Sequence, residues 1–255
     1  MRRSLSVIAA LLISACGLLP DKIDETKNWS ASRFYSEAKE ELEDGNYPRA
    51  VQLFETLESR YPYGRYAQQS QLEIAYAYYK DDDPASAIAA ADRFIKLHPN
   101  HPNVDYAYYL KGLTSFNEEA GFFAAVGGQD LTERDPKAAR ESFDAFKELT
   151  TRYPQSRYAA DATARMLYLT NALATHEVHV ARYYVKRGAH IAAINRAQYV
   201  LTTYPQAPAR LEALQIMVKS YDVIGMANLR DDTARVLRQN FPDSGKGDKS
   251  WWKFW

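Results

Sequence analysis

The chain has 255 residues, of which 46% are hydrophobic and 25% charged, with a formal net charge of zero and one cysteine. This balance predicts a globular body with a real core, and it excludes a disordered chain and a disulfide framework. Removal of Arg2 and Arg3 with a signal peptide would leave a net charge of about minus two, which argues against nucleic acid as a partner.

Residues 1–15 have the pattern of a signal peptide. A basic start at residues 1–3 precedes an apolar run over residues 5–13, which is too short to span a bilayer. Residues 13–16, Ile-Ser-Ala-Cys, resemble a bacterial lipobox, which implies that Cys16 becomes the acylated N-terminus. The alternative is an ordinary signal peptide with an incidental cysteine.

Gly17 follows this cysteine where an aspartate would be a retention signal, and the resemblance therefore implies sorting to the outer membrane with the body in the periplasm. Residues 16–30 are polar with few apolar anchors. They are predicted to form the lipidated N-terminus and a tether between the membrane and the body.

A nine-residue phrase occurs twice, as Ser-Arg-Tyr-Pro-Tyr-Gly-Arg-Tyr-Ala at 59–67 and Thr-Arg-Tyr-Pro-Gln-Ser-Arg-Tyr-Ala at 151–159. Proline cannot continue a helix, and the small polar residues after it can cap the next one. Shorter aromatic-proline pairs end at Pro99, Pro205 and Pro242. Five such closures predict five repeats.

Small or apolar residues recur at fixed distances before these prolines. The position twelve residues before holds Ala50, Ala87, Ser142, Ala193 and Arg230, and the position eight before holds Phe54, Ala91, Phe146, Ala197 and Ala234. Gly45, Gly188 and Gly225 lie where hairpins would turn. The pattern predicts an all-α superhelix of about five tetratricopeptide-type helical hairpins over residues 31–242.

Two insertions stretch the regular period. Residues 118–133, with Phe122 and Phe123, are predicted to form a surface loop before a helix that starts at Asp135-Pro136. The interval from Ser156 to Arg187 lacks glycine and proline, which predicts one long or kinked helix. Residues 243–255 are predicted to be a flexible tail ending in aromatics.

No catalytic or metal pattern stands out. His176 and His179 are three residues apart, whereas a zinc-protease helix needs a spacing of four with a glutamate between them, and no third ligand is evident. We therefore expect residues 176–179 to form a solvated helix face, and His98 and His101 to be solvated as well. The sequence predicts a non-enzyme without metal or cofactor.

Several segments closely resemble the BamD family of lipoproteins of the β-barrel assembly machinery, and the likeness extends to about residue 242. They lie at 61–69, 74–80, 92–97, 101–103, 111–113 and 134–136. The resemblance implies a non-catalytic scaffold that binds a periplasmic POTRA domain of BamA, holds the other Bam lipoproteins and receives unfolded outer-membrane proteins. The alternative is a pilotin-type lipoprotein for a secretin or pilus system, or a module that docks a cell-wall enzyme.

The resemblance also suggests two sets of site residues. It implies that Arg196 contacts the POTRA domain, although an ordinary surface arginine remains the alternative. Counting repeat positions places a client groove along the first helices, on a concave face with Lys39, Leu42, Leu72 and Leu113 and with the rings of Tyr35, Tyr76, Tyr79, Tyr106, Tyr109 and Phe116. Tyrosine offers a rigid ring with a polar tip, which suits a peptide groove, but such rings also serve as core.

The tail ends in Trp251-Trp252-Lys253-Phe254-Trp255, for which the family pattern offers no guide. Tryptophan favours the membrane–water interface. Three interpretations stay open: the tail enters the inner leaflet as a second anchor, inserts into a partner pocket, or occupies the client groove of its own chain.

Overall fold

The computed structural model describes residues 26–116 and 136–242, which contain ten helices and no strand. This confirms the predicted all-α class. The helices are α2 Ala31–Glu43, α3 Tyr47–Arg60, α4 Arg65–Lys80, α5 Pro84–Leu97, α6 Val104–Ser115, α8 Lys137–Arg152, α9 Ala159–Lys186, α10 His190–Thr203, α11 Arg210–Val223 and α12 Ala227–Asn240.

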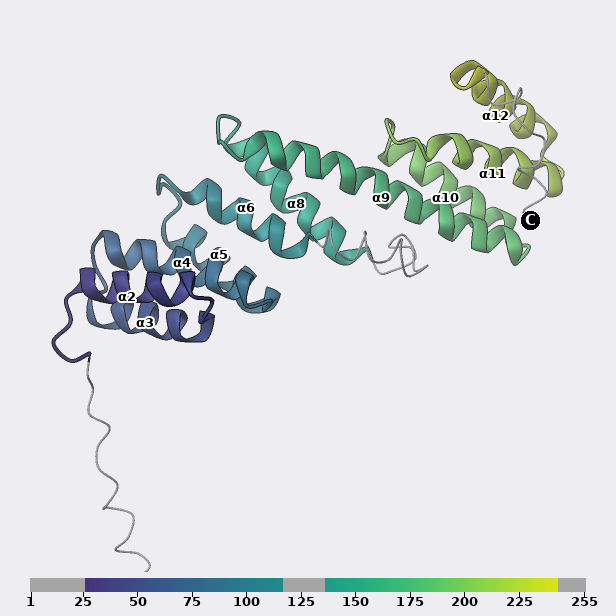
Figure 1. The fold of residues 1–255 in the computed structure, drawn as a ribbon. Coiled ribbons are helices and arrows are strands. Elements are labelled where there is room, and N and C mark those ends of the chain that lie inside the picture. Colours follow the sequence, from purple (N-terminus) through teal and green to yellow (C-terminus); the bar gives the residue numbers. More distant parts are fainter. Residues whose placement is uncertain (1–25, 117–135, 243–255) are drawn as a thin grey trace, which may run out of the picture.

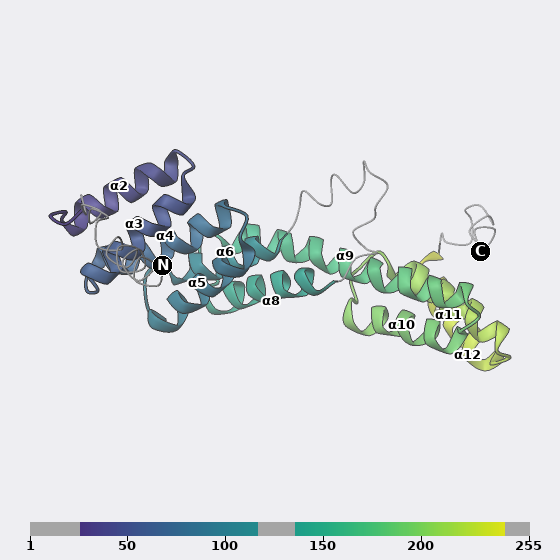
Figure 2. The same ribbon diagram turned by 90° about the horizontal axis from the view of Figure 1, so that it is seen from below.

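The helices form five hairpins in chain order, which pair α2 with α3, α4 with α5, α6 with α8, α9 with α10, and α11 with α12. Each hairpin packs on the next. The first helices of neighbouring hairpins also touch, and examples are the contacts of α2 with α4 and of α9 with α11. The body is an elongated row with α2 at one end and α12 at the other (Figures 1 and 2). Such a repeat array holds together through contacts between neighbours.

The four hairpin turns that the structure describes share one backbone conformation. Gly45, Gly188 and Gly225 have positive φ angles of 81°, 72° and 75°, and Asp82 takes the same role in the second hairpin with a φ of 56°. Glycine adopts this left-handed region without a steric cost. The predicted turns at the three glycines are therefore confirmed.

The repeated small residues form the inside of the array. Ala50, Ala87, Ser142 and Ala193 are fully buried, as are Phe54, Ala91, Phe146 and Ala197. The fifth repeat differs, because Arg230 and Ala234 lie in α12, which has no buried residue. This helix ends the described row, so its outer side has no following hairpin to cover it.

The long helix α9 confirms the prediction drawn from the missing glycine and proline, since it runs for 28 residues. Ala162 and Leu169, in its first half, belong to a core cluster shared with α6 and α8. Leu173, Val178 and Ala181, in its second half, belong to a cluster shared with α10 and α11. One continuous helix therefore joins the two halves of the row.

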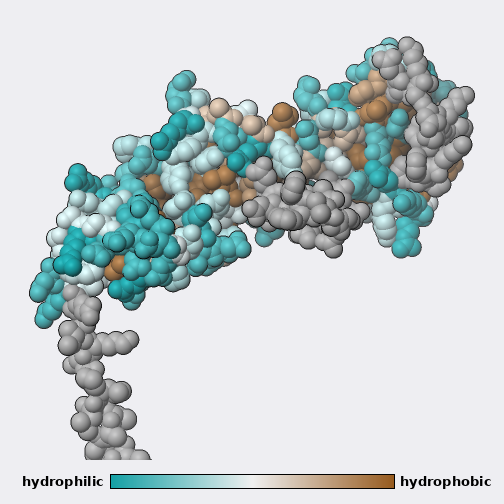
Figure 3. Space-filling view, viewed as in Figure 1, coloured by the Kyte–Doolittle hydropathy of each residue, from teal (hydrophilic) through white to brown (hydrophobic). Residues whose placement is uncertain are grey.

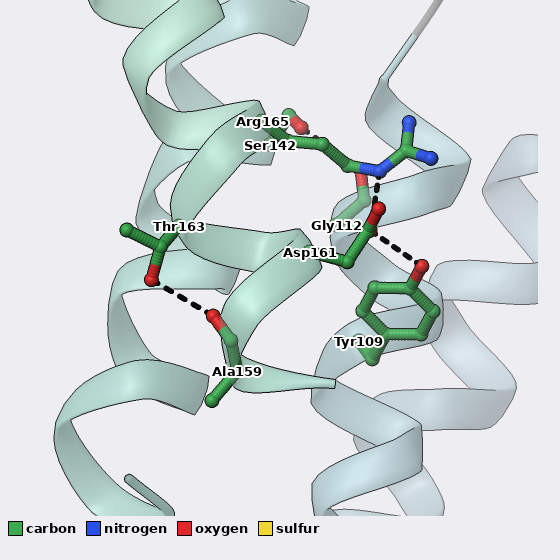
Figure 4. Close-up of polar contacts among 7 residues, drawn as sticks. All are labelled: Tyr109, Gly112, Ser142, Ala159, Asp161, Thr163 and Arg165. Carbon is green, nitrogen blue, oxygen red and sulfur yellow. Dashed lines mark hydrogen bonds and ion pairs between the residues drawn. The ribbon is translucent and has the colours of Figure 1, made fainter. Parts of the chain in front are cut away.

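Helices α6 and α8 approach each other closely at Gly112 on α6. A Cβ atom there would lie 2.3 Å from Cε1 of the fully buried Phe146 ring on α8. The Ser142 hydroxyl beside it donates a buried hydrogen bond of 2.8 Å to the carbonyl oxygen of Gly112 (Figure 4). The third hairpin thus depends on a residue without a side chain at this position.

We expect Gly112→Ala to lower the free energy of unfolding by about 1–3 kcal/mol, because the buried ring must shift to admit a methyl group. Urea unfolding followed by circular dichroism measures the change. Phe146→Leu should relieve the overlap, so the double variant should cost less than the sum of the two single changes. Additive costs would show that the two residues do not compete for space.

Candidate functional site

The candidate site follows the first helices of the first three hairpins. The predicted rings Tyr35 on α2, Tyr76 and Tyr79 on α4, and Tyr106 and Tyr109 on α6 are all half-buried, as is Phe116 at the end of α6. Tyr108 lies on the other face of α6, where only 5% of it is exposed against Tyr153. The predicted rings therefore contact the core on one side and remain accessible on the other.

Three further tyrosines complete this row. Tyr66 packs beside Tyr35 with ring centroids 5.5 Å apart, Tyr158 stacks on Tyr109 at 4.6 Å, and Tyr168 meets the edge of Phe116 at 5.7 Å. We call these nine residues the aromatic row: Tyr35, Tyr66, Tyr76, Tyr79, Tyr106, Tyr109, Phe116, Tyr158 and Tyr168. Sequence reasoning missed Tyr66 and Tyr158, although they occupy the same place in the two copies of the phrase.

The second half of the phrase builds the same local structure in both copies. Arg65 lies over the ring of Tyr66 at 4.9 Å, and Arg157 lies over the ring of Tyr158 at 4.7 Å. A guanidinium is attracted to the face of an aromatic ring. The Arg-Tyr pair therefore fixes a ring of the row at the point where each helix restarts.

Polar contacts join the first helices of successive hairpins. Tyr35 donates a hydrogen bond of 3.1 Å to Oε1 of Glu73 on α4, and Lys39 pairs with Oε2 of the same carboxylate at 3.3 Å. Arg182 on α9 binds Glu212 on α11 through two hydrogen bonds of 2.9 and 3.0 Å. These bonds hold neighbouring first helices in register.

The clearest of these contacts is at the start of α9 (Figure 4). Asp161 accepts hydrogen bonds of 2.7 Å from the Tyr109 hydroxyl and 2.7 Å from Arg165 Nε. Burial alone would raise the pKa of Asp161, but these two donors hold it below its usual value. Burial first, and then the bond to Asp161, raise the pKa of Tyr109 to about 12, so the phenol stays a neutral donor.

Two leucines predicted for the groove are instead core residues. Leu42 is 5% exposed and Leu72 is 2% exposed, since each faces the hydrophobic clusters between hairpins. The ammonium group of Lys39 pairs with Glu73. Leu113 is half-buried in the same cluster as Phe116. Apart from Leu113, the accessible apolar residues of the predicted groove are therefore aromatic.

The prediction of a solvated face at residues 176–179 is wrong for Glu177, which is 2% exposed. Helices α8 and α10 cover this side of α9, and each supplies an arginine to the carboxylate. Arg196 Nη1 lies 3.0 Å from Glu177 Oε2, and Arg140 Nη2 lies 3.3 Å from Oε1. Arg196 therefore has a partner inside its own chain, yet 46% of its side chain remains exposed.

His98 and His101, which were predicted to be solvated, are partly buried. His98 and His101 both pack against Phe94, with centroid distances of 5.3 and 5.1 Å, and this burial lowers the pKa of His101. Within residues 26–116 and 136–242, no group of three or more histidine, cysteine or acidic side chains is arranged to hold a metal ion.

Three predicted features lie outside the described residues: Cys16, the loop with Phe122 and Phe123, and the aromatic tail. In the part of the chain that the structure describes, no helix is both long enough and apolar enough to cross a membrane.

Comparisons with known proteins agree with one another. Residues 27–237 match the family model YfiO, described as an outer membrane lipoprotein. The outer membrane protein assembly factor BamD of Neisseria meningitidis serogroup B is 49% identical over 98% of both chains. BamD of Vibrio cholerae serotype O1 is 38% identical over 92% of this chain and 96% of its own length.

Among solved structures, MamA protein aligns with a TM-score of 0.32 and 15% identity over 86% of this chain and 95% of its own, a likeness too distant to bear on the site. The family match and the near end-to-end relatives show that the chain belongs to the BamD family of outer membrane lipoproteins, as the resemblance predicted.

Proposed function

We propose that this chain is a lipid-anchored, non-catalytic scaffold of outer-membrane protein assembly. It takes unfolded outer-membrane proteins along the aromatic row, binds the periplasmic POTRA domain of BamA through Arg196, and stands among the other Bam lipoproteins. Relatives named as outer membrane protein assembly factors, which match this chain almost end to end, support the proposal.

The proposal rests mainly on the observation that the rings of the aromatic row are held in fixed positions. Its phenol groups at Tyr35 and Tyr109 are fixed by carboxylates of the next first helix, and its rings at Tyr66 and Tyr158 are held under arginines. Rings that are already immobilised lose little entropy when a ligand packs against them. A row of this kind suits an extended client segment that carries aromatic side chains.

Replacing Tyr79 and Tyr109 together by alanine should weaken crosslinking of a C-terminal outer-membrane-protein peptide by roughly tenfold or more, since each aromatic contact contributes about 0.5–1.5 kcal/mol. Tyr108→Ala is the matched control, because this ring lies on the opposite face of α6. It should lower the melting temperature without a specific loss of crosslinking. If crosslinking falls in proportion to the loss of stability in both variants, the rings of the row serve only as core residues.

Arg196 and Arg140 offer a matched pair for the proposed partner site, because both contact the same buried carboxylate. We expect Arg196→Gln to weaken binding of the purified POTRA domain at least tenfold, as loss of an interfacial charge pair usually does. Arg140→Gln removes the other partner of Glu177 and should leave binding unchanged. Glutamate is avoided at 196, since it would face Glu177 and destabilise the fold.

Isothermal titration calorimetry measures the affinity, and a thermal melt of each variant measures the stability. Equal losses of affinity in the two variants would assign the effect to the packing around Glu177, and unchanged affinity in both would remove Arg196 from the partner site.

Cys16→Ser should release the protein from the outer membrane without unfolding it, because the first described helix begins at Ala31, fifteen residues further along the sequence. Several acyl chains anchor a protein stably, whereas one binds only marginally. Fractionation of cell envelopes gives the location, and circular dichroism of the released protein gives the folded state. A variant that still fractionates wholly with the outer membrane would exclude lipidation as the main anchor.

A further inference from the structure

The loop in the first copy of the phrase packs against the start of the described body. Tyr61 donates a hydrogen bond of 2.7 Å to the carbonyl oxygen of Trp29, and Arg60 Nη1 donates one of 2.7 Å to the carbonyl oxygen of Thr26. Arg33 lies over the Trp29 ring at 4.6 Å. The loop and the root of the tether therefore form one continuous surface.

This surface combines exposed cations with aromatic rings. We call it the tether-root patch and define it as Lys27, Trp29, Arg33, Arg60, Tyr61, Tyr63 and Arg65. Its four cations are all exposed, and one of them, Arg33, pairs with Glu37 at 3.7 Å. The ring of Tyr63 is 93% exposed. Cationic and interfacial aromatic side chains are the types that favour an anionic membrane surface.

The second copy of the phrase shows that folding does not require the Tyr63 ring. Gln155 stands at the equivalent position, yet α8 ends at Arg152 as α3 ends at Arg60, and a helix restarts after both loops. Tyr153, the counterpart of Tyr61, still packs on a core tyrosine. The exposed aromatic ring is therefore specific to the copy beside the tether.

The position of the patch relative to the anchor agrees with a membrane contact. Thr26 is ten positions after Cys16, and a fully extended segment of this length spans at most about 35 Å. In the space-filling view, hydrophilic residues cover most of the end of the body that carries α2 and α3 (Figure 3). A surface of this kind suits the headgroup layer rather than the hydrocarbon core.

We propose that the tether-root patch docks on anionic phospholipid headgroups of the membrane to which the chain is anchored, with its four cations facing phosphates and Tyr63 at the interface. The inference rests on the proposed lipidation of Cys16. It adds an orientation to the anchor, since the lipid alone would leave the body free to turn on its tether.

The lack of any cysteine besides Cys16 allows a local test. The mature chain from residue 16, carrying Cys16→Ser, receives either Tyr63→Cys or Gln155→Cys, and the new thiol is labelled with an environment-sensitive fluorophore. With vesicles of phosphatidylethanolamine and phosphatidylglycerol in a 3:1 ratio, the emission of the label at 63 should shift to the blue, whereas the label at 155 should not respond. Equal shifts at both positions, or none at 63, would overturn the proposal.

A second measurement tests the charges. In the Cys16→Ser chain, Lys27→Gln with Arg33→Gln should lower the vesicle partition coefficient roughly fivefold for each cation removed. Lys137→Gln with Arg152→Gln removes two exposed cations elsewhere and should have little effect. Equal losses of vesicle binding in the two double variants would contradict headgroup docking by this patch. So would binding to vesicles of phosphatidylcholine alone that is as strong as binding to the anionic vesicles.

These results are separable from the test of the anchor, because both vesicle experiments use a chain that cannot be acylated. A lipidated chain whose patch does not bind vesicles would keep the proposed anchor and lose the proposed orientation. A chain that is not lipidated but binds through the patch would lose the anchor and keep the membrane contact.

Discussion

The close contact within each hairpin is the constraint on which the rest of the structure depends. The second helices of the first four hairpins place a fully buried small residue against their partners, and in the third hairpin Gly112 admits the Phe146 ring. Close crossings bring the first helices of neighbouring hairpins within reach of one another. Only then do a tyrosine on one helix and a carboxylate on the next, such as Tyr109 and Asp161, meet at 2.7 Å.

Helix α9 links the two proposed binding regions mechanically. Tyr158 of the aromatic row immediately precedes it, Asp161 in its first turn holds Tyr109 of the row, and Glu177 in its second half holds Arg196. Asp161 and Glu177 are sixteen positions apart on this helix, which corresponds to about 24 Å along its axis. Because both ends are packed into core clusters, a partner at Arg196 and a client at the row would sit at a fixed spacing. A scaffold needs this property.

Sequence periodicity predicted the hairpins, the glycine turns and the long helix, because prolines, glycines and small residues act locally. It failed where burial depends on neighbours. The sequence predicted a solvated face around Glu177, but α8 and α10 cover this carboxylate and supply two arginines. The same counting predicted Leu42 and Leu72 in the groove, but both are buried in the core. A residue at the edge of a helix face points into the core or away from it depending on how the helix is rotated about its axis, which its neighbours decide. Tyr66 and Tyr158 were missed because the phrase was treated only as a helix stop and restart.

The two copies of the phrase separate what is required for folding from what is specific to one end of the row. Both keep the proline and the Arg-Tyr pair, which end one helix and fix a ring at the start of the next. Only the first copy has Tyr63 and Gly64, whose φ of 104° favours glycine, and it is this copy that bonds to the described end of the tether at Thr26 and Trp29. With that end at the membrane, the row would begin nearest the bilayer at Tyr35 and Tyr66. Arg196 would then lie further along the body, beyond the rings that a client meets first.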